Sequence, residues 1–227
     1  MKFNIKELLD FLDNKKGSQK GDANALIAVF GEDLNAGVFK HFRKNKVEIL
    51  EENTSQGLKK EKRLDRWILD KKENKLFQCE IKNWAATAIG GRSLKYDAND
   101  EDTRKVVEYY WKRELSNNLS KKAEQPNGVT KVLLKMKPIE KYRNAKVEPL
   151  LIYWMPISSD IKGLAPLSVL SVKSLRLPIK TKFSKLYIFS VSLYLRQLYK
   201  NGKGDKFIEL DMPHFENRIK LLNRLKG

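Results

Sequence analysis

The sequence predicts an α/β protein in which a β-sheet is flanked by helices. Two apolar runs, 64–69 and 76–81, are separated by the polar segment 70–75, which has the length and composition of a turn between antiparallel strands. Apolar residues recur about every 3.6 positions over residues 22–44, and again from Thr103 to about residue 120, as they do in amphipathic helices. We therefore expect a β-hairpin with one helix before it and another after it.

Shorter elements are expected on both sides of these. In chain order they are an amphipathic helix at 3–13, a strand at 47–50, a strand or short helix at 129–136, a buried strand at 149–155, a strand at 185–195 continuing as helix to 199, a strand at 207–210 and a helix at 213–225. Asp22 is a candidate cap of the helix at 22–44. We expect one domain over residues 1–227, with its core at about 22–155 and a C-terminal elaboration at about 156–227.

Composition limits the classes of partner. The chain has 227 residues, with 46 Lys and Arg against 28 Asp and Glu, which gives a formal net charge of +18. Such an excess favours a polyanionic partner, first nucleic acid and second an anionic membrane surface. The membrane is disfavoured because the basic residues are not concentrated on one amphipathic helix. A hydrophobic fraction of 41% is enough for a packed core and argues against a disordered basic tail.

The few cysteines and histidines limit the kinds of metal site. Cys79 is the single cysteine, so an intrachain disulfide and a cysteine zinc cluster are excluded. With only His41 and His214 besides, any metal must be held by oxygen atoms. Cys79 shares a strand face with Phe77 and Ile81, so we expect a buried small apolar residue. The N-terminus lacks the apolar core of a signal peptide, and no apolar run reaches the 18 or so residues of a membrane span, so we expect a cytoplasmic protein.

A polar set of side chains interrupts the apolar hairpin. Gln78, Glu80 and Lys82 share one face of the second strand, and antiparallel pairing brings Asp65, at the start of the first strand, towards Glu80. Two carboxylates on rigid strands suit Mg²⁺, and a nearby lysine can orient a metal-bound water and stabilise charge on a phosphate. The alternative is that Glu80 and Lys82 form the solvent face of an edge strand and that Asp65 is a strand end facing water.

Asp65, followed after fourteen residues by Glu80-Ile81-Lys82, resembles the D…ExK signature of the PD-(D/E)xK, or restriction-endonuclease-like, nuclease superfamily. The order of helix with an acidic residue, strand, strand with Asp, strand with ExK and helix is similar to that of Holliday-junction resolvases and related enzymes. The resemblance covers roughly residues 22–115, and the proline that commonly precedes the Asp is Leu64 here. It implies a restriction-endonuclease-like core, a central mixed β-sheet flanked by helices, with additional C-terminal α/β elements.

The resemblance also implies roles for individual residues. Asp65 and Glu80 would ligate Mg²⁺ or Mn²⁺ directly, the Ile81 backbone carbonyl would supply a further oxygen, and Lys82 would position the nucleophilic water. Glu32, in the helix at 22–44, would be a water-mediated or second-metal acid; its alternative is a solvated helix residue. The implied activity is that of a metal-dependent endonuclease hydrolysing phosphodiester bonds in DNA, and because cutting both strands of a duplex calls for two sites, a homodimer is expected.

Two alternatives to a DNA endonuclease remain open, a nucleic-acid-binding module of the same fold without catalysis and an RNA-directed nuclease. Nucleic-acid contacts are expected beside the motif. The basic run before Asp65 is either a phosphate-binding flank or a solvated face, and the segment after Lys82 resembles the loop that leads into a helix lining the nucleic-acid channel. Trp84 could stack on a base there, although a core tryptophan is the more frequent outcome. The candidate contact residues are Lys59, Lys60, Lys62, Arg63, Trp84 and Arg92.

Overall fold

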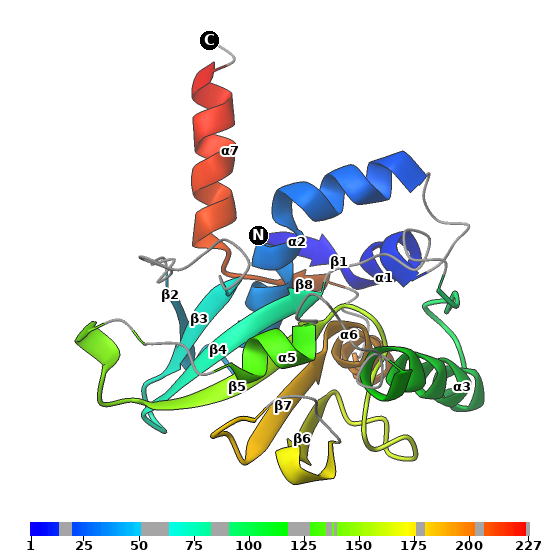
Figure 1. The fold of residues 1–227 in the computed structure, drawn as a ribbon. Coiled ribbons are helices and arrows are strands. Elements are labelled where there is room, and N and C mark those ends of the chain that lie inside the picture. The colour runs from blue at the N-terminus through cyan, green and yellow to red at the C-terminus, as the bar shows by residue number, and fades with distance from the viewer. Residues whose placement is uncertain are drawn as a thin grey trace.

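A mixed six-stranded β-sheet lies at the centre of the structure, with helices on both of its faces (Figure 1). The structure is a computed structural model, and it describes residues 1–13, 20–50, 64–82, 91–117, 128–134, 138, 140–175, 180–202 and 207–225. The α/β class expected from the sequence is therefore confirmed.

The sheet has the strand order β2-β3-β4-β5-β7-β6. Its strands are β2 (Val47–Leu50), β3 (Arg66–Asp70), β4 (Lys75–Lys82), β5 (Lys146–Tyr153), β6 (Leu167–Ser171) and β7 (Lys185–Ser190). Neighbours are antiparallel from β2 to β4, parallel from β4 through β5 to β7, and antiparallel again between β7 and β6. Strand β4 thus has an antiparallel partner on one side and a parallel partner on the other.

The expected hairpin is formed by β3 and β4, with Arg66 opposite Cys79 and Asp70 opposite Lys75. Asn74 ends the turn with a φ of 47°, a left-handed conformation that asparagine tolerates better than most residues. Arg43 braces the turn from outside, because its Nη2 lies 2.6 Å from a carboxylate oxygen of the buried Asp70. The register of the hairpin is therefore held by the turn and by a charged contact from Arg43, the residue that follows α2.

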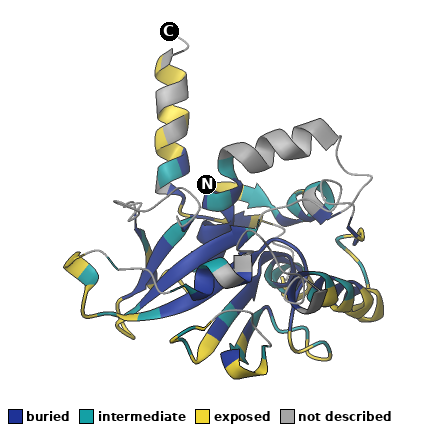
Figure 2. Ribbon diagram, in the orientation of Figure 1, coloured by how far each residue is buried: buried dark blue, intermediate teal, exposed yellow. Residues whose placement is uncertain are grey.

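Three helices cover one face of the sheet, namely α1 (Ile5–Asp13), α2 (Lys20–Phe42) and α6 (Val191–Asn201). Phe77, Cys79 and Ile81 of β4 belong to the apolar core on this face. The other face carries α3 (Asp100–Trp111), the π-helical turn η2 (Lys112–Asn117) and α5 (Gly128–Leu133). The central strands are buried between these two layers (Figure 2).

The remaining elements lie at the periphery. Strands β1 (Lys2–Asn4) and β8 (Phe207–Glu209) pair with each other, and α7 (Pro213–Leu225) projects away from the sheet (Figure 1). The described residues also include two short 3₁₀ turns, Glu140–Tyr142 and Val172–Ser174. None of the helices in the described ranges is long and apolar enough to cross a membrane.

Most of the expected elements are present, and several of them begin or end at other residues than expected. Helix α2 begins at Lys20, so Asp22 lies inside the helix rather than at its cap. Residues 2–4 form a strand because they pair with β8, a contact across 200 positions of the chain. Strand β7 ends at Ser190, whose side chain accepts a hydrogen bond from the Leu193 N–H and so caps α6. The segment expected as strand or short helix at 129–136 is the helix α5.

A buried ion pair joins α1 to α6 on the face of the sheet that these helices cover. Nη2 of Arg196 lies 2.9 Å from a carboxylate oxygen of Asp13, and both side chains are at most 5% exposed. Nε1 of Trp154 donates a 2.8 Å hydrogen bond to the other oxygen of Asp13, while Arg196 also donates to the carbonyls of residues 94–96. Burial nevertheless raises the pKa of Asp13, an effect that the charge of Arg196 opposes.

Candidate active site

Asp65 and Glu80 meet where β4 extends beyond the first residue of β3. Arg66 pairs with Cys79, so the next position outward places Asp65 opposite Glu80. The Asp65 N–H donates to the Cys79 carbonyl at 3.1 Å, and Oδ2 of Asp65 accepts a 2.7 Å hydrogen bond from the Ile81 N–H. The Asp65 carboxylate therefore accepts the hydrogen bond from the Ile81 N–H that a backbone carbonyl of β3 would accept if that strand were longer.

The Ile81 carbonyl is directed to the same side of β4 as the Asp65 carboxylate. The N–H and C=O of one strand residue point to the same side, and the Ile81 N–H faces Asp65. The carbonyl of the next residue, Lys82, points to the opposite side of β4 and accepts a 2.8 Å hydrogen bond from the Trp154 N–H. One carbonyl and one carboxylate thus converge at this strand end.

Lys131 of α5 lies between the two carboxylates. Its Nζ is 2.7 Å from Oε2 of Glu80 and 3.9 Å from Oδ1 of Asp65. No sequence pattern identifies this residue, because it stands 51 positions from Glu80 and 66 from Asp65 in a segment without a recognisable motif. Only the packing of α5 against β4 brings it to the site.

Lys82 lies on the same face as Glu80, as expected from strand alternation. Its Nζ is 2.8 Å from Oε1 of Glu80, so the two oxygens of this buried carboxylate contact different lysines. The charge of Lys82 also acts on Glu114, a buried residue of the π-helical turn. Burial raises the pKa of Glu114, and the positive charges of Arg113 and Lys82 oppose that rise. A second acidic group therefore lies close to the lysine of the motif.

Crowding of negative charge affects the acidity of Asp65. Burial, followed by the charge of Glu80, raises the pKa of Asp65 to about 6 from 3.8. The Ile81 N–H and Lys131 oppose this rise, and the charge of Glu32 adds to it. The arrangement thus keeps two carboxylates close together at a free-energy cost, which is common at functional sites.

Glu32 is held by Arg66 rather than by the carboxylate pair. Its Oε2 lies 3.2 Å from Nη1 of Arg66. Nη2 of the same guanidinium donates a 2.8 Å hydrogen bond to Oδ1 of Asp33. Arg66 Nη1 also donates to the Asp65 carbonyl at 2.7 Å. The structure therefore brings Glu32 close enough to influence Asp65, with an arginine as its direct partner.

The oxygen atoms at this strand end suit a divalent cation of the Mg²⁺ type. The described residues contain no group of three or more His, Cys, Asp or Glu side chains that could hold a metal ion. Asp65 and Glu80 nevertheless both lie beside the ammonium of Lys131, and the Ile81 carbonyl points to the same side. Mg²⁺ typically takes one or two carboxylates and keeps several waters, so these donors fit it.

The expected nucleic-acid contacts lie mainly beyond the described residues, since Lys59, Lys60, Lys62, Arg63 and Trp84 all fall in undescribed segments. Arg92 is exposed, with its guanidinium over the ring of Tyr109 at 4.9 Å. Its carbonyl accepts a 2.9 Å hydrogen bond from the Tyr110 hydroxyl, which fixes the backbone at this position.

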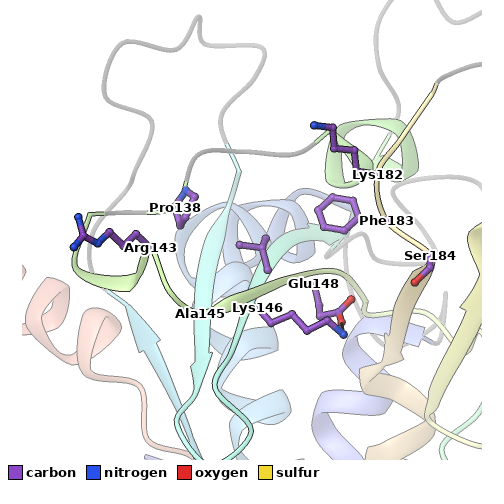
Figure 3. A pocket seen from close by; sticks show the side chains of 9 residues that line it. Pro138, Arg143, Ala145, Lys146, Glu148, Lys182, Phe183 and Ser184 are labelled. Carbon is purple, nitrogen blue, oxygen red and sulfur yellow. Dashed lines mark ion pairs between the residues drawn. The ribbon is translucent and has the colours of Figure 1, made fainter.

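A separate pocket of about 370 Å³ opens near the beginnings of β5 and β7 (Figure 3). Arg143, Lys146 and Lys182 lie in its wall together with Glu148, which pairs with Lys146 at 2.6 Å. Because β5 runs parallel to β4, the pocket is at the end of the sheet opposite to Lys82. It therefore does not include the carboxylate pair.

Comparisons with known proteins give no match, whether with models of protein families, with curated proteins or with solved structures. We therefore infer the function from the geometry of the site.

Proposed function

We propose that this chain is a metal-dependent nuclease of the PD-(D/E)xK type that hydrolyses phosphodiester bonds in DNA. The observation that carries the proposal is the register of β3 and β4, which places Asp65 opposite Glu80 with Lys82 on the same strand face. The alternative, in which Glu80 and Lys82 form the solvent face of an edge strand, is disfavoured because β4 is a central strand and Glu80 is only 3% exposed.

The strand arrangement supports the same proposal. Helix α2 is followed by the antiparallel strands β2, β3 and β4, then by further helices and by β5, which is parallel to β4. Asp65 immediately precedes β3, and Glu80 stands on β4. This is the order that the resemblance to restriction-endonuclease-like nucleases implies. The π-helical turn beside Lys82 is a further feature that occurs frequently at functional sites.

The chain's own groups can perform most of the work of hydrolysis. Asp65, Glu80 and the Ile81 carbonyl would hold a Mg²⁺ or Mn²⁺ ion, which lowers the pKa of a bound water and neutralises charge on the phosphate. The Lys82 ammonium can orient the attacking water through a hydrogen bond and stabilise the negative charge that grows on the phosphate oxygens. A new bond joins the water oxygen to phosphorus while that water releases a proton to solvent, one ester P–O bond breaks, and the departing oxygen takes up a proton from solvent.

The net charge of +18 supports a nucleic acid as the substrate. Lysine and arginine contacts with phosphates release condensed counterions, so binding should weaken steeply as the salt concentration rises. Exposed basic side chains would supply this affinity without sequence preference.

The test is cleavage of supercoiled plasmid and of a junction-containing duplex in Mg²⁺, Mn²⁺, Ca²⁺ or EDTA. We expect cleavage with Mg²⁺ or Mn²⁺, and its loss by at least about 100-fold in Glu80→Gln and Lys82→Met, as for groups that act in the transition state. Glu148→Gln is the matched control, because Glu148 is also a buried strand glutamate paired with a lysine. Equal activity of Glu80→Gln and Glu148→Gln would overturn the assignment.

A nucleic-acid-binding module without catalysis is the second candidate. It is favoured by the contact of Lys131 with both carboxylates, since an ammonium satisfies the charges that a metal would otherwise satisfy. Binding of these DNA substrates with no cleavage, even in Mn²⁺, would favour it. Single-stranded RNA and duplex RNA, assayed in parallel, would show whether the chain is an RNA-directed nuclease instead.

A further inference from the structure

We propose that Lys131 is an internal counter-ion that holds the Asp65–Glu80 pair in the metal-free protein and competes with the divalent cation for it. This inference rests on the proposed function, because it concerns the same two carboxylates. It assigns a role to a residue outside the sequence motif and predicts that the chain weakens its own affinity for metal.

The Lys131 ammonium and a divalent cation require the same oxygens. Nζ of Lys131 contacts Oε2 of Glu80 at 2.7 Å and lies 3.9 Å from Oδ1 of Asp65. The other oxygen of each carboxylate already has a partner, since Glu80 Oε1 contacts Lys82 and Asp65 Oδ2 accepts from the Ile81 N–H. A cation that enters between the carboxylates must therefore displace the Lys131 ammonium.

Hydrogen bonds hold the backbone that places Lys131 between the carboxylates. The amide of Gln78 donates to the carbonyls of Val132 and Leu134, the latter at 2.8 Å. Thr181 Oγ1 donates to the Leu133 carbonyl at 2.8 Å. These bonds from two different segments satisfy backbone groups at the end of α5, which is too short to be stable by itself.

Apolar packing fixes the same helix from its other side. Val129, Val132 and Leu133 are each at most 1% exposed and belong to the core formed with β5 and β7. The Cα of Lys131 is therefore held beside the carboxylates, whereas rotation of its four-carbon side chain can move the ammonium away from them. Displacement by a metal requires a change of side-chain rotamer and leaves α5 in place.

Without a positive charge between its members, the carboxylate pair would destabilise the folded protein. Glu80 is 3% exposed, and two carboxylates at such a place repel one another strongly because solvent screens them little. Exposed lysine pairs on this chain differ, since Lys112 contacts Glu108 on α3 with both side chains about half exposed or more. Pairs of that kind contribute little, whereas removal of one partner of a buried pair leaves an uncompensated charge.

The expected size of the competition follows from the fraction of time that Lys131 is engaged. If the carboxylates are free of Lys131 about 10% of the time, the apparent affinity for metal is about tenfold lower than the intrinsic affinity. Removing the ammonium should therefore tighten metal binding by about tenfold or more.

The experiment is calorimetric titration of Mn²⁺ into the full chain at pH 7.5, comparing wild type with Lys131→Met and Lys112→Met. Both variants lose one lysine, so they change the net charge equally. We expect the dissociation constant to fall by about tenfold or more in Lys131→Met and by less than about twofold in Lys112→Met, with binding abolished in Glu80→Gln.

Failure of this inference is distinguishable from failure of the proposed function. If wild type binds Mn²⁺ through Glu80 and Lys131→Met binds it no more tightly than Lys112→Met, the counter-ion role is wrong and the metal site stands. If neither wild type nor Lys131→Met binds Mn²⁺, the metal-dependent function and the counter-ion role are both wrong.

A measurement on the wild-type chain covers the case in which Lys131→Met does not fold. Amine labelling followed by mass spectrometry reports how accessible each lysine is with and without Mn²⁺. We expect the labelling rate of Lys131 to rise at least about threefold when Mn²⁺ is added, while that of Lys112 stays constant. An unchanged rate for Lys131 at saturating Mn²⁺ would overturn the proposal.

Discussion

Replacing Asp65 by Asn should make the protein more stable at neutral pH. Burial and the charge of Glu80 raise the pKa of Asp65 to about 6 from 3.8, so the folded state disfavours the ionised carboxylate. An amide removes the charge, and its oxygen can still accept the hydrogen bond from the Ile81 N–H. A gain in stability from the loss of a polar motif residue would indicate that the wild-type residue is kept for another purpose.

The size of the gain follows from the pKa shift. Moving the pKa from 3.8 to about 6 corresponds to about 3 kcal/mol, and the variant also loses the attraction between Asp65 and Lys131, so we expect a gain of about 1–3 kcal/mol. Because the folded-state pKa is the higher one, the destabilisation is full well above pH 6 and is lost as the pH falls towards 3.8. At pH 5 the gain from Asp65→Asn should therefore be about half of its value at pH 7.5.

The assay is urea unfolding of wild type and Asp65→Asn at pH 7.5 and pH 5, with a chelator in the buffer. Asp70→Asn serves as the control at the other end of β3, where the carboxylate accepts from Arg43 Nη2 at 2.6 Å and from the Glu73 N–H at 3.1 Å. That variant should be less stable than wild type at both pH values. The reasoning is refuted if Asp65→Asn is no more stable than wild type at pH 7.5, or if its gain is the same at pH 5.

Three further outcomes are expected. Arg196→Met should lower the free energy of unfolding by about 3–5 kcal/mol, because it leaves the buried Asp13 carboxylate unpaired, whereas Lys200→Met on the same helix should change it little. Gln78→Leu should lower it by about 1–3 kcal/mol and speed hydrogen exchange in α5, and unchanged exchange would show that the amide does not hold the helix. Cys79 should react with a thiol reagent only after unfolding, since burial raises its pKa, and a fast reaction of the native protein would contradict the structure.

The hairpin and the acidic pair could be predicted from the sequence because they depend on local alternation. Side chains two residues apart share a strand face, so Glu80 and Lys82 had to lie together once the strand was recognised. The polar turn set the register, which in turn brought Asp65 opposite Glu80.

The contribution of α5 could not be predicted, because it depends on contacts between distant segments. Lys131 stands in a six-residue helix with no motif, and the hydrogen bonds from Gln78 and Thr181 that place it span about 50 positions. The partner of Glu32 could not be predicted either. Helical spacing puts this residue on the flank of the core, but it does not show whether Arg66 or a metal is its partner. Pattern analysis thus located the strand-borne groups and missed the helix that contacts them.

The way in which β3 meets β4 restricts how the turn between them can change during evolution. Parallel pairing with β5 fixes β4 independently, so an insertion of one residue at 71–74 would be absorbed by a shift of β3. A shift of one position turns every side chain of β3 to the other face and sets a neighbour of Asp65 opposite Glu80. If that neighbour is Arg66, a cation replaces a carboxylate at the site. Substitutions in this turn should therefore be frequent among descendants of this chain, and odd-numbered insertions or deletions should be rare.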